Sequence, residues 1–131
     1  MNTIKTIRNE FEINNDVATN RAWCASIAVG NDEISASGAS EFSAVGRLYL
    51  KLSSEYEIAR KTFDAVKSGD VKVTKYMTGY DAGKVCVQML NDHTYGESFT
   101  ASSEEDAKAG LSAWALDRMT AIAAATDSFM R

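Results

Sequence analysis

The chain has 131 residues, 45% of them hydrophobic and 24% charged, with a formal net charge of −4. These values predict one globular domain and argue against a disordered chain. The acidic balance argues against nucleic acid as a partner, because Lys and Arg must neutralise phosphates. The sequence shows no N-terminal apolar signal region and no membrane-length apolar run, so we expect a cytoplasmic protein that does not bind membranes.

The first third of the chain predicts three strands. Residues 6–14 alternate apolar and polar side chains, which is typical of a strand with one face in water. Residues 21–29 carry apolar or small side chains on both faces and predict a central strand. Gly30-Asn31-Asp32 predicts a hairpin turn, since Gly and Asn tolerate positive φ angles, and residues 33–37 return as a third strand.

A helix is expected over residues 40–68. Ser40 is the expected N-cap, and Ser68-Gly69-Asp70 is the expected stop. The capping-box pattern Ser54-x-x-Glu57 leaves open whether this segment is one helix or two in line. The apolar stripe consists of Phe42, Val45, Leu48, Tyr49, Leu52, Tyr56, Ala59, Phe63 and Val66.

The second half repeats this plan. Strands are expected over residues 71–78, 85–89 and 97–101, and Ser102-x-x-Glu105 predicts the capping box of a final helix. The tail over residues 123–128 has little amphipathicity and is expected to fray. The apolar stripe of this helix consists of Ala107, Leu111, Trp114, Ala115, Met119 and Ile122. The aromatic residues expected to be mostly buried are Trp23, Phe42, Phe63, Phe99 and Trp114.

An internal duplication explains this shared order. The run that opens at Ser40 recurs sixty-three residues later at Ser103, with Ser, Glu, Ala and Leu at matching positions. Asn31-Asp32 and Asn91-Asp92 mark a turn before each helix. We therefore predict an α+β fold, a pseudo-twofold tandem βββα-βββα repeat with antiparallel sheet and two main helices on one face. The predicted single domain, 1–131, consists of two similar halves, 1–68 and 69–131.

The motifs of common catalytic sites are absent. The single histidine, His93, and the two cysteines, Cys24 and Cys86, show no zinc-site spacing. Nucleophile-elbow and phosphate-loop patterns do not occur either. We expect no metal, no cofactor, no catalytic residue and no enzymatic activity. The cysteines are expected to be reduced and buried, although a bridge between the two halves stays open if their Cα atoms lie within about 7 Å.

Candidate binding residues gather in the second half. The hairpin tip between its second and third strands offers donors, acceptors and an aromatic ring, and two further tyrosines alternate with polar residues or lie at turns. An ordinary longer hairpin and ordinary strand tyrosines are the alternatives. The candidate binding residues are Asn91, Asp92, His93, Tyr95, Tyr76 and Tyr80.

A family resemblance adds an expected shape. Asp81-Ala82-Gly83-Lys84-Val85-Cys86-Val87, then Gly96-Glu97-Ser98-Phe99 and a helix with Ala107 and Ala109, resembles one half of the regulatory domain of 2-isopropylmalate synthase. That resemblance implies a tandem βββα module that dimerises and holds an amino acid at the seam between its copies. The catalytic barrel that accompanies such a domain has no counterpart in this sequence.

A second resemblance concerns function. A small acidic domain without catalytic motifs is similar to the accessory proteins of bacteriophages, many of which occlude a host defence or regulatory protein. It implies a non-enzymatic interaction protein, a phage-type inhibitor of a host protein. The alternative is a small-molecule binding or sequestering domain that uses the seam between the halves or a homodimer interface. A homodimer through helix faces or edge strands is expected.

Overall fold

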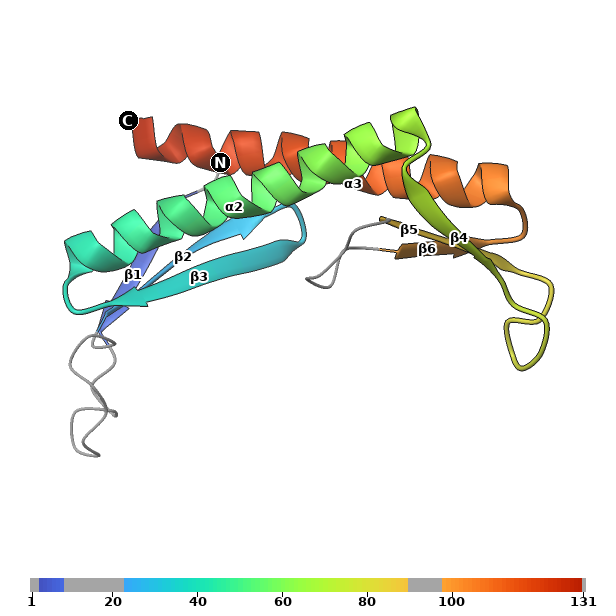
Figure 1. The fold of residues 1–131 in the computed structure, drawn as a ribbon. Helices are drawn as coiled ribbons and strands as arrows, with labels where there is room; N and C mark the ends of the chain where they lie inside the picture. The colour runs from blue at the N-terminus through green and yellow to red at the C-terminus, as the bar shows by residue number, and fades with distance from the viewer. Residues whose placement is uncertain (1–2, 9–22, 90–97, 131) are drawn as a thin grey trace. The chain divides into compact units, whose positions relative to one another are not determined.

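The computed structural model describes residues 3–8, 23–89 and 98–130 (Figure 1). Its strands form two three-stranded antiparallel sheets, each followed by a long helix, so the α+β class and the βββα-βββα order are confirmed. We call the sheet β1-β2-β3 sheet A and the sheet β4-β5-β6 sheet B. The elements are β1 (Lys5–Arg8), β2 (Trp23–Val29), β3 (Asp32–Gly38), α2 (Glu41–Ser68), β4 (Val71–Lys75), β5 (Val85–Met89), β6 (Ser98–Ala101), α3 (Glu104–Thr126) and the 3-10 helix η2 (Asp127–Met130).

Strand register shows the duplication directly. Cys24 in β2 pairs with Ser37 in β3, and Cys86 in β5 pairs with Thr100 in β6. Ser37 and Thr100 are sixty-three residues apart, which is also the spacing between the two helix starts. The two cysteines therefore occupy the same position in the two repeats, and both are free thiols that are half-buried.

Helix burial follows the same spacing. Five positions of α2 and the five positions of α3 that lie sixty-three residues later are all fully buried or nearly so, so the repeat determines which residues face inward. These pairs are Ala44 and Ala107, Leu48 and Leu111, Leu52 and Ala115, Ala59 and Ile122, and Thr62 and Ala125.

Helix α2 is one continuous helix. Residues 41–68 are helical without a break, so the capping-box pattern at Ser54 does not start a second helix. The hydroxyl of the neighbouring Ser53 donates to the carbonyl of Tyr49 at 3.1 Å, which accommodates that serine inside the helix. The predicted N-cap is confirmed, because the amide of Ser43 donates to the hydroxyl oxygen of Ser40 at 3.0 Å. The helix ends at Ser68, and the following Gly69 has a φ of 84°, which favours glycine, as the sequence predicts.

Both ends of α3 differ from expectation. Its N-cap is Ser103 and not Ser102, since the amide of Asp106 donates to the Ser103 hydroxyl oxygen at 3.1 Å. Ser103 lies sixty-three residues after the cap of α2, so the repeat identifies the cap better than the capping-box pattern. The expectation of a frayed tail is wrong, because Ala125 is fully buried and the Thr126 hydroxyl donates to the carbonyl of Ile122.

The chain divides into two compact units whose bounds differ from those of the repeats. Unit 1 contains residues 1–56 and 120–131, and unit 2 contains residues 57–119. Each unit therefore includes one sheet, the first part of the helix that follows it and the last part of the other helix. In unit 1, Ile122 of α3 joins the core formed by β2, β3 and α2, and in unit 2, Val66 of α2 packs against the core of Val87, Ala107 and Leu111.

Several aromatic residues are less buried than the sequence predicts. Phe42 is 89% exposed, because it lies about 120° around the helix from buried Leu48. Phe99 is 40% exposed at the edge of sheet B. The half-buried tryptophans, Trp23 and Trp114, pack against the cores of units 1 and 2.

Strand bounds also shift slightly. Strand β4 ends at Lys75, three residues earlier than expected, because the next residues form a hairpin. The expected strand over residues 6–14 overlaps β1, and its part beyond Arg8 lies outside the described residues. In the part of the chain that the structure describes, neither helix is long and apolar enough to cross a membrane.

Candidate binding surface on sheet B

The candidate site begins on the outer face of sheet B, the face opposite the core. Val87 in β5 is fully buried in the core, so its neighbour Cys86 points to the other side. Cys86 pairs with Thr74 in β4 and with Thr100 in β6. These three side chains form a cross-strand row of polar groups in the middle of the sheet.

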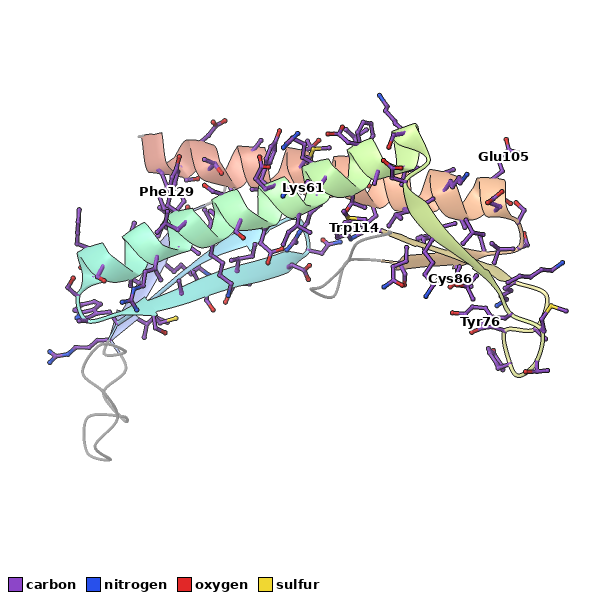
Figure 2. All side chains as sticks on the ribbon, in the orientation of Figure 1. Lys61, Tyr76, Cys86, Glu105, Trp114 and Phe129 are labelled. Atoms are coloured by element: carbon purple, nitrogen blue, oxygen red, sulfur yellow. The ribbon has the colours of Figure 1, made fainter. Side chains whose placement is uncertain are left out.

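Tyr76 lies beside this row, at the point where β4 becomes a hairpin. Figure 2 shows Tyr76 and Cys86 on the same part of sheet B. The pKa of Tyr76 is raised above its ordinary value, first because its hydroxyl is a hydrogen-bonding neighbour of the Cys86 sulfur, while a hydrogen bond with Thr100 lowers it. Polar side chains of both other strands, Cys86 in β5 and Thr100 in β6, thus lie next to the Tyr76 hydroxyl.

Residues 76–84 form an ordered hairpin loop that continues from Tyr76. The amide of Tyr76 donates to the carbonyl of Lys84 at 2.9 Å, and the amide of Gly83 donates to the carbonyl of Tyr76 at 2.8 Å. Gly79 and Gly83 have φ angles of 87° and 86°, and in this region side chains with a Cβ are strained. The glycines therefore let the chain turn within a few residues, and the backbone bonds fix the loop.

Two large apolar side chains stand on this hairpin. Tyr80 is 99% exposed and Met77 is 78% exposed. The ammonium group of Lys84 lies 5.8 Å from the centroid of the Tyr80 ring and 3.4 Å from a carboxylate oxygen of Asp81. A cation on one ring face and a nearby carboxylate restrict the Tyr80 ring without covering it.

The side chains of this surface are of kinds that are frequent in binding sites. The surface offers an aromatic ring, a flexible thioether, a tyrosine hydroxyl and paired charges, and all of them can contact another molecule without a reaction. Within residues 3–8, 23–89 and 98–130, no group of three His, Cys, Asp or Glu side chains is arranged to hold a metal ion.

The structure places two of the six predicted binding residues. Tyr76 and Tyr80 come together on the hairpin of residues 76–84, Tyr76 half-buried at its base and Tyr80 exposed at its tip. Asn91, Asp92, His93 and Tyr95 lie outside the described residues, so their binding role stays a prediction.

Sequence reasoning missed Met77 on the hairpin, because residue 77 falls inside the expected strand over residues 71–78. It also missed an apolar surface on α2, where Phe42 is 89% and Leu50 is 67% exposed. A position-by-position comparison of the two repeats could have identified part of this apolar surface. Phe42 corresponds to Glu105 in α3, and a charged partner at a repeated position indicates an outward direction. Leu50 corresponds to the uncharged Ala113, which gives no such signal.

Comparisons with protein-family models, with curated proteins and with solved structures give no match for this chain. The resemblance to the regulatory domain of 2-isopropylmalate synthase, the small-molecule site at the seam and the cytoplasmic location therefore stay predictions.

Proposed function

We propose that this chain is a protein-binding module that contacts its partner through the hairpin of residues 76–84. The observation that carries the proposal is the exposure of Tyr80 and Met77, 99% and 78%, on a loop that backbone hydrogen bonds hold in one shape. An ordered loop loses little entropy on binding, so most of the contact energy is retained.

The residue types support the same conclusion. Tyrosine combines a large apolar ring with a polar hydroxyl and has only two side-chain torsions to fix, which is why it is frequent among the residues that dominate interface energies. Methionine adapts its shape to a partner surface. The Asp81–Lys84 pair beside them supplies a polar rim.

The partner that we propose is a host protein, bound in the way small phage accessory proteins bind theirs. Binding would act by covering a functional surface of that partner, without chemistry on it. The support is indirect: a small domain of net charge −4, the absence of catalytic motifs from its sequence, and a structured apolar hairpin on its surface.

Affinity purification from a bacterial lysate tests the proposal. Tagged wild type is compared with the double variant Met77→Ala/Tyr80→Ala, and Leu50→Ala on α2 is the control for loss of an exposed apolar side chain. We expect a specific partner to bind the double variant at least about thirtyfold more weakly, as for dominant interface residues, and the control to bind like wild type. Equal binding by the double variant would show that the contact lies elsewhere.

A further inference from the structure

Sheet edges carry unpaired backbone groups that attract other strands, and proteins usually protect them. Sheets A and B have four edge strands among the described residues: β1, β3, β4 and β6. Strand β1 carries Lys5 and Arg8, and strand β4 carries Lys72 and Lys75. Charged side chains on an edge, lysine above all, oppose the approach of an identical edge, so these two strands are protected by charge.

Strand β3 is protected in another way. Val29 and Asp32 close a two-residue hairpin, so alternate residues of β3 point their carbonyls away from β2. Ser35 and Ser37 are such residues. The ammonium of Lys51 donates to the Ser35 carbonyl at 2.9 Å, and the guanidinium of Arg47 donates to the Ser37 carbonyl at 3.2 Å. Two cations of α2 therefore cap two of the outward carbonyls of this edge.

Among the described residues, strand β6 shows neither protection. Its sequence, Ser98-Phe99-Thr100-Ala101, contains no charge and no proline. By the repeat, Ser98 and Thr100 correspond to the two capped residues of β3, but the α3 residues at the positions of the two capping cations are Gly110 and Trp114. Across the described residues, the structure records no side chain bonded to either carbonyl, and Ser98, Phe99 and Thr100 are all exposed.

We propose that the β6 edge pairs with the β6 edge of a second copy of this chain. The pairing is antiparallel about a twofold axis at Phe99. Ser98 then faces Thr100 of the partner subunit, and Thr100 faces Ser98 of the partner subunit, as two hydrogen-bonded pairs. The two sheets B join into one continuous sheet across the dimer.

A second copy fits this edge for three reasons. The edge is uncharged, so identical strands do not repel each other despite a net charge of −4 per chain. The outward backbone groups of the edge, those of Ser98 and Thr100, are two residues apart, so two identical strands can bond to each other through them in antiparallel pairing. Phe99, 40% exposed, meets Phe99 of the partner subunit in the non-hydrogen-bonded position, where Cα atoms approach to about 4.5 Å and side chains are closest.

The size of the contact sets the expected strength. Strand β6 has only 4 residues, so the contact is at the small end of specific interfaces and the dimer depends on concentration. The pairing does not involve the hairpin of residues 76–84, so the Met77→Ala/Tyr80→Ala variant should dimerise like wild type.

Analytical ultracentrifugation from micromolar to submillimolar concentration tests the pairing. Ser98→Pro removes an outward amide while the bonds between β5 and β6 remain, because proline is tolerated at the first position of an edge strand. We expect roughly thirtyfold weaker dimerisation from the two amides lost per dimer. Ser35→Pro, the corresponding change in the capped strand β3, is the matched control and should dimerise like wild type.

Ser98→Lys keeps the test decisive if the proline variant does not fold. It adds a charge on the exposed face of the same edge and should weaken dimerisation in the same direction. Circular dichroism checks that each variant is folded. A wild type that stays monomeric over the whole range, or a folded Ser98→Lys variant that dimerises like wild type, overturns the proposal.

Discussion

The two repeats agree in what they bury and differ in what they expose. Leu48 and Leu111 occupy the same position of the repeat, are both fully buried, and each belongs to the core beneath one sheet. On the outside, cations of α2 cap the β3 edge, whereas the part of the chain that the structure describes places no such cap on the β6 edge. The inward positions are constrained by packing, and a change there costs stability in every copy. The outward positions are free to diverge, so differences between the repeats are places where a specialised contact can arise.

One coupled pair shows how this divergence respects packing. In the first repeat, Ala36 of β3 corresponds to Phe99 of β6, and Arg47 of α2 corresponds to Gly110 of α3. The Phe99 ring lies directly over Gly110, in the space that a Cβ atom would take. The second repeat has therefore exchanged a small strand residue and a long helix residue for a large strand residue and a glycine.

The largest effect that we expect tests the shared interior. Leu48→Ala and Leu111→Ala should each lower the free energy of unfolding by about 2–5 kcal/mol, because both remove a fully buried side chain. Chemical denaturation measures the free energy of unfolding of both variants. Leu50→Ala removes a side chain that is 67% exposed and should change this free energy by less than about 0.5 kcal/mol. If truncation of either buried leucine leaves the free energy of unfolding unchanged, the two repeats do not share the same interior.

The next effect tests the coupled pair. Gly110→Ala places a methyl group against the Phe99 ring, so we expect a loss of about 1–3 kcal/mol in unfolding free energy. Phe99→Ala in the same chain should recover most of that loss, since it restores the small strand residue of the first repeat. Gly46→Ala is the matched helical control: a Cβ there meets no atom within 4 Å, and alanine should stabilise α2 by up to about 1 kcal/mol. If the loss of unfolding free energy in the double variant equals the sum of the losses in the two single variants, Phe99 and Gly110 are not coupled.

A third variant tests the edge difference. Arg47→Ala/Lys51→Ala removes both caps from β3 and gives the chain a second open edge. Both side chains are exposed, so the unfolding free energy should change by only about 1 kcal/mol. Light scattering should instead show assemblies larger than a dimer, because a chain with two open edges can extend. Lys61→Ala/Lys67→Ala removes the same charge from exposed positions of α2 and should leave assembly unchanged.

Sequence reasoning predicted the elements whose signals are local. The Ser40 cap, the Gly69 stop and the turn at Gly30 each follow from the backbone preferences of one or two residues, and all are present. Phe42 is assigned to the core incorrectly, because three-and-four spacing does not fix the direction of a residue near a helix end. Phe99 does lie on the core side of sheet B, with its ring over Gly110, but at the sheet edge it stays 40% exposed.

The candidate site was harder to predict, because it depends on strand register. Tyr80 and Tyr76 were identified as candidates from their turn and strand positions. The proximity of Tyr76 to Cys86 and Thr100 comes from residues on three different strands, and no local pattern specifies it. The capping of β3 by α2 is likewise a tertiary feature, visible only once helix and edge are placed together.

The smallest expected effect distinguishes the two cysteines. The hydrogen-bonding contact with Cys86 is the main cause of the raised pKa of Tyr76, so Cys86→Ala should move that pKa back towards the ordinary tyrosine value of about 10. Cys24→Ala changes the corresponding position of sheet A and should leave it unchanged. Alkaline titration of tyrosine absorbance, with Tyr76→Phe as the subtraction reference, measures the shift.

The same shift has a defined sign for stability. Because the folded state keeps the Tyr76 proton at a pH where the unfolded chain loses it, the folded state binds more protons between the two pKa values. The contribution of Tyr76 is therefore fully present below the unfolded pKa and is lost as the pH rises through the folded pKa. Tyr76→Phe should flatten the decline of stability above about pH 10. An unchanged slope, or a Tyr76 titration that Cys86→Ala leaves in place, would show that the hydroxyl and the thiol do not interact in solution.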